Sequence, residues 1–237
     1  MTRIALASTL LLLSACDSSP DEPFVAVLED ATDIPADPAT RDPSTGQVTG
    51  TGNFTLFSLR ASDSTRTARD ERIVVRYDDA ERADSATTQW DIGFRGTEVI
   101  LNGGSSGPGA ALGVIVPEPF DEISDALATD AAFRRDGESP AGPVRGPARA
   151  VCTGSGNGWY TYVPFPSGQG GYIVPTAGRT LLVRLADGQG YAKVRFDSYY
   201  RGNPDPAAIT ERSEDRFYTF SYVTNPDGSS FEDDVEE

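Results

Sequence analysis

The stretch TQWDIGFRGTEVILNGGSSG, residues 88–107, has the clearest structural pattern in this 237-residue chain. Trp90, Ile92 and Phe94 alternate with polar residues or glycine, the period-2 pattern of a half-buried strand. The apolar run at 99–101 continues as a second, buried strand. Three glycines follow within 102–107, and glycine allows the positive φ angles and close approaches of a turn. The stretch therefore predicts two strands joined by a tight loop and closed by a glycine-rich turn.

Segments with β-branched or aromatic residues, bounded by turn formers, recur along the chain. Strands are predicted at 54–59, 72–77, 89–95, 98–101, 112–116, 148–153, 159–164, 172–175, 180–185, 191–199 and 217–223. The turn formers at 187–190 predict a hairpin, with Ala192, Val194 and Phe196 on one face of its second strand. Helical spacing occurs only at 118–135. The prediction is an all-β fold of mostly antiparallel sheets, with at most one or two short helices.

The first residues have the pattern of a secretory signal peptide. Arg3 precedes an apolar run at 4–13 that is too short to span a bilayer. Leu-Ser-Ala-Cys at 13–16 resembles a lipobox, in which Cys16 receives lipid and becomes the new N-terminus; a secretory signal with a chance cysteine is the alternative. We expect 1–15 to be a signal peptide and the mature protein to be an outer-membrane lipoprotein held by a lipid anchor, with the periplasmic face and the cell surface both open as its location.

Composition predicts the remaining domain limits. Residues 16–50 are expected to be a lipidated N-terminus and flexible acidic tether, because they are rich in Asp, Pro, Thr and Gly. The apolar residues within 24–28 are the exception and are expected to form a strand that docks on the domain. The β domain is predicted at 51–231, followed by a solvated acidic tail at 232–237.

Charge and cysteine content narrow the function. The formal net charge is -16, and Lys193 is the one lysine, which argues against nucleic-acid binding and favours solubility. With Cys16 lipidated, Cys152 is the remaining thiol, so no intramolecular disulfide is expected. The fold must therefore be stabilised by its core.

The chain contains no histidine. This excludes Ser-His-Asp and Cys-His catalysis and removes the commonest metal ligand. The glycine-rich segment 154–158 lacks the Lys-Ser/Thr of a phosphate loop. Carboxylates such as Asp130 and Asp136 are interpreted as solvated groups rather than as the acid and base of a glycosidase. We predict that the protein is not an enzyme and has no metal site.

Two motifs resemble those of the HmuY-like family, lipoproteins of Bacteroidetes-type bacteria whose founding members capture haem. The first is WDIGFR at 90–95 with NGGSSG at 102–107, and the second is LADGQGYAKVRF at 185–196. The resemblance spans about 54–231 and implies an HmuY-like fold, haem or porphyrin capture for uptake, and a TonB-dependent receptor as partner. Its signature residues, expected to be structural, are Trp90, Asp91, Asn102, Gly103, Gly104 and Gly107.

Haem would need ligands other than those of the family. The founding member holds haem iron between two histidines and some relatives use methionines, whereas the one methionine here is Met1. The chain offers flat aromatic walls for the ring and a tyrosinate or cysteine thiolate for the iron. It also offers arginines, such as Arg201, that could pair with the propionates. The candidate ligand-binding residues are Trp159, Tyr160, Tyr162, Cys152, Arg95 and Tyr199.

A structural role in the core is the alternative interpretation of these aromatic residues and of Cys152. Two functions are compatible with the sequence. One is haem or porphyrin capture. The other is the same fold with a different small ligand, or a surface protein partner, and no haem coordination.

Overall fold

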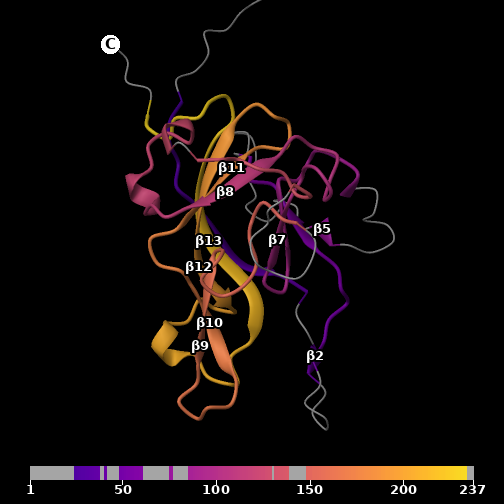
Figure 1. The fold of residues 1–237 in the computed structure, drawn as a ribbon, viewed down its shortest axis with the longest axis vertical. Coiled ribbons are helices and arrows are strands. Elements are labelled where there is room, and N and C mark those ends of the chain that lie inside the picture. Colours follow the sequence, from indigo (N-terminus) through magenta and orange to yellow (C-terminus); the bar gives the residue numbers. More distant parts are fainter. Residues whose placement is uncertain are drawn as a thin grey trace, which may run out of the picture.

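The structure is a computed structural model, and it describes residues 24–37, 40–41, 48–60, 75–76, 85–129, 131–138 and 148–233. The predicted signal peptide, Cys16 and Asp130 lie outside the described residues. The described chain forms two larger β-sheets and two short hairpins (Figure 1). None of the helices within these ranges is long and apolar enough to cross a membrane.

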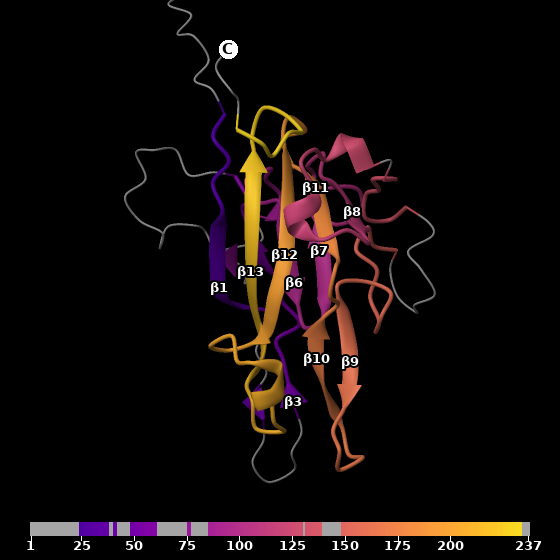
Figure 2. The same ribbon diagram turned by 90° about the vertical axis from the view of Figure 1, so that its left-hand side faces the viewer.

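The larger sheet has five strands in the order β1-β13-β12-β11-β8, and every neighbouring pair is antiparallel (Figure 2). Its strands are β1 (Glu29–Pro35), β8 (Leu112–Val116), β11 (Thr180–Arg184), β12 (Tyr191–Tyr200) and β13 (Asp215–Asn225). The predicted hairpin joins β11 to β12, where the Leu185 N–H donates to the Gly190 carbonyl at 2.9 Å. The turn prediction at 187–190 is confirmed.

The second sheet has four strands in the order β5-β4-β6-β7. Its strands are β4 (Thr55–Phe57), β5 (Val75–Arg76), β6 (Ile92–Arg95) and β7 (Glu98–Leu101). The two strands predicted from residues 88–107 are thus β6 and β7, and they pair antiparallel through Arg95 and Glu98. Gly96 makes the turn between them with a φ of 53°, which glycine adopts without strain.

Two hairpins extend from these sheets. They are β2 (Thr40–Arg41) with β3 (Val48–Thr49), and β9 (Tyr160–Pro164) with β10 (Gly171–Pro175). The β9–β10 hairpin lies at the end of the molecule opposite to residues 229–233 (Figures 1 and 2).

Aromatic side chains from both sheets form the core between them. The Phe94 ring on β6 lies 4.5 Å from the Tyr218 ring on β13, and the Phe57 ring on β4 lies 5.2 Å from Phe220 on β13, between centroids. All four side chains are buried. Burial of each large ring removes apolar area from water and stabilises the packed sheets.

The predicted alternation along β12 is confirmed. Ala192, Val194 and Phe196 belong to this central core, while Tyr191 packs in a second apolar cluster on the outer face of the larger sheet. Lys193 also points to the outer face, where its Nζ donates to two carbonyl groups. The period-2 pattern therefore assigned the two faces of this strand correctly.

The all-β prediction is confirmed, and the prediction of a helix at 118–135 is wrong. Within the described ranges that segment has only the 3-10 turns η2 (Phe120–Glu122) and η3 (Leu127–Thr129). Ile123 is extended, with φ -93° and ψ 108°, so η2 ends there. The apolar residues of 118–135 cover the outer face of the larger sheet from separate turns. Near-helical spacing alone could not distinguish such turns from a helix. A third 3-10 turn is η4 (Pro206–Ala208).

The strand predicted at 148–153 is absent from that described segment. Val151 is buried there as predicted for an apolar residue, but the Ala150 N–H donates to the Asp136 side chain at 2.8 Å instead of to a neighbouring strand. A side-chain acceptor thus satisfies this backbone, which the sequence pattern does not reveal.

The tether predicted at 16–50 contains a strand of the larger sheet. β1 pairs with β13, and it needs to bury only Ala31 and Ile34 because it is an edge strand. Residues 24–28, predicted to be a strand, are irregular. The folded unit therefore starts before residue 51.

Candidate functional site

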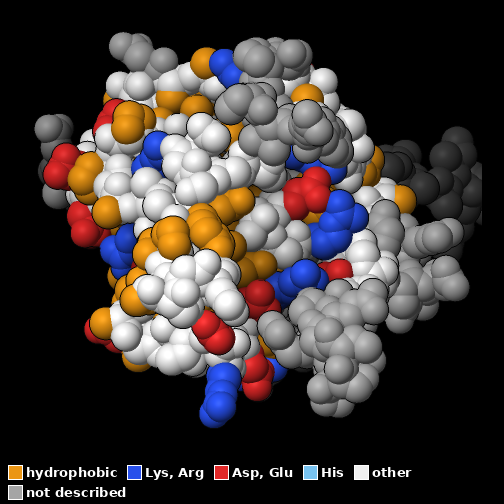
Figure 3. All heavy atoms as spheres, turned by 60° about the horizontal axis from the view of Figure 1, so that its bottom comes forward, with side chains coloured by type: hydrophobic (Ala, Val, Ile, Leu, Met, Phe, Trp, Pro, Cys, Tyr) orange, Lys and Arg blue, Asp and Glu red, His pale blue; other side chains and the backbone are white. Residues whose placement is uncertain are grey.

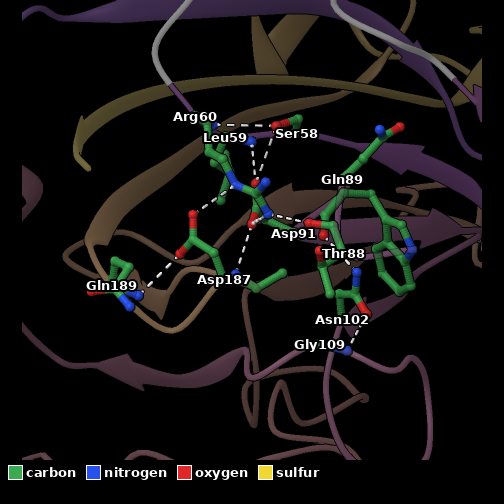
Figure 4. A network of polar contacts seen from close by, with 12 residues as sticks. Ser58, Leu59, Arg60, Thr88, Gln89, Asp91, Asn102, Gly109, Asp187 and Gln189 are labelled. Atoms are coloured by element: carbon green, nitrogen blue, oxygen red, sulfur yellow. Dashed lines mark hydrogen bonds and ion pairs between the residues drawn. The ribbon is translucent and has the colours of Figure 1, made fainter. Parts of the chain in front are cut away.

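The signature residue Asp91 is the centre of a buried polar network (Figure 4). Its Oδ2 accepts the Leu59 N–H at 2.9 Å, and its Oδ1 accepts the Ala186 N–H at 2.8 Å. Arg60 Nη2 lies 3.0 Å from the same Oδ1, and Arg60 Nε lies 3.4 Å from Asp187 Oδ2. Burial raises the pKa of Asp91, although the Ala186 N–H and Arg60 act against this. The network joins β4, β6 and the β11–β12 turn, where the two family motifs meet.

Asn102 connects the other signature residues to the same region. Its Nδ2 donates to the Trp90 carbonyl at 2.8 Å and its Oδ1 accepts the Gly109 N–H at 2.9 Å. A Cβ on Gly103 would lie 2.2 Å from the Ala111 carbonyl oxygen, and one on Gly107 would lie 2.1 Å from Asn102 Oδ1. The backbone passes so closely that only glycine fits at these positions.

A second network surrounds Asp136, which is buried rather than solvated as the sequence suggested. Its Oδ2 accepts the Ser106 hydroxyl at 2.6 Å and the Leu101 N–H at 3.0 Å. Burial raises the pKa of Asp136, while the Ser106 hydrogen bond acts against this. Arg149 donates to Ser106 and, through Nε, to Glu98 Oε1 at 2.8 Å. The Asp136 carboxylate thus positions the glycine-rich turn, and both of its oxygens accept hydrogen bonds from the protein.

Two aromatic candidates for ligand binding, Trp159 and Tyr199, lie in the central core. Trp159 is 2% exposed and its Nε1 donates to the Thr97 carbonyl at 3.1 Å. Tyr199 is 3% exposed, and burial raises the pKa of its phenol well above the ordinary value. Neither side chain is available to an external ligand without opening the core.

The remaining candidates are scattered. Tyr160 is half-buried against Trp159, whereas Tyr162 is exposed on the β9–β10 hairpin. Arg95 is occupied, because its Nη2 lies 2.6 Å from Glu98 Oε2 and its guanidinium stacks 4.2 Å from the Phe54 ring. Cys152 is half-buried and carries a free thiol. The structure brings Trp159 into contact with Tyr160 and Tyr199, at 5.0 and 5.8 Å between ring centroids, but this cluster belongs to the core.

A groove does open elsewhere, between the β9–β10 hairpin and the 201–214 loop that joins β12 to β13. It consists of a hollow of about 940 Å³ and a smaller one of about 560 Å³, which share lining residues Phe165, Thr210, Glu211 and Arg212. We call this the groove; its lining comes from within 165–171 and 200–217. Figure 3 shows apolar side chains gathered on this end of the molecule, with charged side chains beside them.

Aromatic rings line the groove from both sides. Phe165 comes from the hairpin, and Tyr200 and Phe217 come from β12 and β13. The Ile173 N–H donates to the Tyr200 hydroxyl at 3.1 Å, which ties the hairpin to the larger sheet. Burial raises the pKa of Tyr200, although that hydrogen bond acts against it. Tyr200 and Phe217 are 6% and 7% exposed, whereas Phe165 is half-buried, so Phe165 provides the more accessible aromatic surface of the groove.

The charges of the groove are mixed, with an excess of carboxylates. Two arginines and three carboxylates line it, namely Arg201, Arg212, Glu211, Glu214 and Asp215. Arg201 is engaged with Glu214 at 2.6 Å and with the Phe217 ring at 3.8 Å. Glu211 accepts a hydrogen bond from Ser167 at 3.3 Å, across the smaller hollow. Arg212 is exposed, lines both hollows and forms no ion pair within the described part of the chain, so its guanidinium is open to a ligand.

Comparison with known proteins identifies the family. The model described as "HmuY protein" matches residues 51–212, more than half of the chain. The chain belongs to the HmuY family. Among solved structures, apo PinO from Porphyromonas gingivitis aligns at 12% identity and a TM-score of 0.31, over 85% of this chain and 98% of that one. No curated protein matches the chain.

The HmuY family implies haem, and the groove fits only part of that ligand. Phe165 can contact a flat ring from the hairpin side, while the buried Tyr200 and Phe217 form the base of the hollow. Axial coordination of iron fits poorly, because the chain has no histidine, Cys152 is not among the groove residues, and burial raises the pKa of Tyr200, which opposes formation of a tyrosinate. Likewise, no cluster of three metal-ligating side chains occurs in the described ranges.

None of the six candidate ligand-binding residues lines the groove, although Arg201, which the sequence suggested as a partner for propionates, does. Glu211 and Arg212 lie in a charged loop that reads as solvated surface, and Phe217 reads as an ordinary strand residue. Their proximity to the hairpin depends on the long β12–β13 pairing, for which the sequence has no local signal.

Proposed function

We propose that this HmuY-family protein is a non-catalytic binding protein that holds a flat aromatic ligand of the porphyrin type in the groove. The observation that carries the proposal is the hollow of about 940 Å³ with Phe165, Tyr200 and Phe217 on its walls. Ring contacts and apolar burial would supply the affinity, and no bond to iron is involved. The absence of histidine from the sequence supports binding rather than catalysis.

The cellular setting is part of the proposal. The lipobox at 13–16 supports lipidation of Cys16 and attachment to the outer membrane at the cell surface. Family membership supports delivery of the ligand to a TonB-dependent receptor. The groove is at the end of the molecule opposite to segment 24–28, so a receptor could reach it while the protein is anchored (Figures 1 and 2).

A second candidate is a flat ligand that is neutral or cationic. The groove carries three carboxylates against two arginines, and one of those arginines already pairs with Glu214. A porphyrin with two propionates would meet this excess of negative charge, whereas a cationic ring would be attracted. This charge balance favours the same fold with a ligand other than haem.

A titration with three probes distinguishes these functions. The mature chain from residue 16, with Cys16→Ser to prevent lipidation, is titrated with ferric haem, iron-free protoporphyrin and a cationic porphyrin, followed by visible absorption. Equal affinity for haem and protoporphyrin is expected, because iron makes no bond. Preference for the cationic ring would support the second candidate, and failure of all three to bind saturably would refute porphyrin binding.

The groove itself is tested by a pair of variants. Phe165→Ala is expected to weaken porphyrin binding about tenfold or more, since a ring–ring contact and its buried area are lost. Tyr162→Ala is the matched control, because Tyr162 is on the same hairpin but does not line the groove. An equal effect of both changes would place the ligand elsewhere.

A further inference from the structure

Exposed aliphatic side chains gather at one end of the molecule. In the described chain, the large hydrophobic side chains that face solvent are Val25, Val27, Leu28, Leu127 and Tyr162. Tyr162 is on the hairpin that borders the groove. The other four, exposed by 55% to 62%, lie on segments 24–28 and 124–127, and we call them together the end patch. Single exposed apolar residues are ordinary, whereas several on segments attached to one strip of chain are a candidate contact surface.

The end patch is held together by the C-terminal residues. The Ala26 N–H donates to Asp233 Oδ1 at 2.7 Å, and the Ala126 N–H donates to the Ser229 carbonyl at 2.9 Å. Segments 24–28 and 124–127 are therefore both attached to 229–233. The patch is a fixed feature of the fold, built from two separate parts of the sequence.

Segment 24–28 presents its two sides differently. Phe24 and Ala26 pack in the outer apolar cluster of the larger sheet, while Val25 and Val27 face away from it. One side of the segment thus attaches it to the domain. The other side offers aliphatic groups to something outside the chain.

The position of the end patch indicates which surface outside the chain it contacts. Phe24 and residues 229–233 lie at the same end of the molecule, opposite to the β9–β10 hairpin (Figures 1 and 2). Only eight peptide units separate Cys16 from Phe24, and they span at most about 29 Å when fully extended. A lipid on Cys16 would therefore hold the end patch close to the bilayer surface.

We propose that the end patch rests on the lipid surface, so that the domain stands on the membrane with its groove facing away. This inference rests on the proposed lipid anchor at Cys16. Insertion of Val25, Val27, Leu28 and Leu127 among the headgroups removes apolar area from water at a site the anchor already brings near. A short link and a docked first segment thus set the orientation of the ligand site.

Charge around the patch selects the kind of lipid. Glu29, Asp30, Glu232 and Asp233 lie beside it, and the one lysine, Lys193, is buried. Anionic headgroups would be repelled by these carboxylates, whereas zwitterionic headgroups would not. The patch is therefore expected to favour phosphatidylcholine or phosphatidylethanolamine surfaces.

Tryptophan quenching tests the orientation. Two lipidated variants of the mature chain are compared, Leu127→Trp and the matched control Tyr162→Trp. Each is placed in phosphatidylcholine vesicles whose acyl chains carry bromine near the headgroups. After the signal of the buried Trp90 and Trp159 in the wild type is subtracted, the fluorescence added at 127 is expected to fall by roughly half, and that added at 162 to stay unchanged, because interfacial side chains enter only about 5–10 Å. Anionic lipid is expected to reduce the quenching, as is the triple change Val25→Ser, Val27→Ser and Leu28→Ser.

Other results overturn the proposal. Equal quenching at 127 and 162, no quenching at either, or quenching that anionic lipid leaves unchanged would each contradict it. A shift in emission at 127 that depends on protein concentration without vesicles would show that a second copy covers the patch. If mass spectrometry finds Cys16 without lipid, the anchor proposal fails; coupling Cys16 to a maleimide phospholipid, in a Cys152→Ser background, then tests the patch separately.

Discussion

Arg60 and Asp91 form an ion pair of 3.0 Å in which the carboxylate is fully buried and the arginine side chain is 27% exposed. The same guanidinium extends to Asp187, whose side chain is 37% exposed, at 3.4 Å. Arg60 thus connects a buried acidic group of one family motif to a surface acidic group of the other. The two ends of this arrangement are expected to differ greatly in their contribution to stability.

Asp91→Asn is expected to lower the free energy of unfolding by about 3 kcal/mol, measured by urea denaturation. The carboxylate accepts from Leu59 and Ala186 as well as from Arg60, so whichever way the amide lies, its NH₂ faces another donor. Asp187→Asn, the control at the exposed end, is expected to cost less than about 1 kcal/mol. Equal losses would show that the buried network is not what stabilises this junction.

Gly104→Ala tests the close approach at the glycine-rich turn. Gly104 has a φ of 61°, and a Cβ there would lie 2.0 Å from the Asp136 carbonyl oxygen. Gly178 has a similar φ of 68° with no atom within 4 Å of its Cβ position, so Gly178→Ala isolates the backbone strain. We expect a loss of about 1–2 kcal/mol for Gly178→Ala. Gly104→Ala should cost a further 1–3 kcal/mol or so from the clash, and similar thermal midpoints for both would contradict this.

The sequence predicted those parts of the fold whose signals are local. Alternation of Trp90, Ile92 and Phe94 located β6, and the glycines of 187–190 located the β11–β12 hairpin. The sequence could not indicate that Asp91 would accept from Ala186, because that contact joins residues 95 positions apart. β1 was missed because an edge strand that buries only Ala31 and Ile34 resembles a polar linker in composition.

The candidate site was predicted less well than the fold. Trp159 and Tyr199 were suitable in type for a flat ligand. Aromatic residues in a β protein most often fill the core, and both are buried there. The groove depends on how the β9–β10 hairpin lies against the 201–214 loop. Neither segment carries a motif that specifies this packing.

The lowered pKa of Glu98 is expected to make the free energy of unfolding depend on pH. Burial tends to raise the pKa of Glu98, but hydrogen bonds from Arg95 and Arg149 outweigh it and hold the pKa below the ordinary 4.5. The resulting stabilisation is fully present above about pH 4.5 and is lost as the pH falls through the folded-state pKa. Denaturation of the wild type and Glu98→Gln should therefore give a difference that is constant near neutrality and shrinks in acid.

The difference between the two proteins is the quantity to follow, because other carboxylates act in the opposite direction. Burial raises the pKa of Asp91 and of Asp136, so their contributions to stability grow as the pH falls. Asp91 shares no partner with Glu98, so its contribution cancels in the comparison, whereas Asp136 shares Arg149 with Glu98 and its contribution cancels only in part. A difference that grows below pH 4.5 would mean that Arg95 and Arg149 do not stabilise the Glu98 carboxylate.

Tyr200→Phe tests how the hairpin is held beside the groove. The Tyr200 hydroxyl accepts the Ile173 N–H at 3.1 Å, and phenylalanine keeps the ring on the groove wall while removing this acceptor. We expect the Ile173 amide to exchange with solvent about five- to tenfold faster, since one hydrogen bond contributes roughly 1 kcal/mol. Porphyrin affinity should fall modestly, because Phe165 is carried by the loosened hairpin while Tyr200 still offers its ring. Tyr162→Phe, a change on the exposed side of the same hairpin, should alter neither quantity. If Ile173 exchanges at the wild-type rate in Tyr200→Phe, the β9–β10 hairpin is positioned by its core contacts through Trp159 instead.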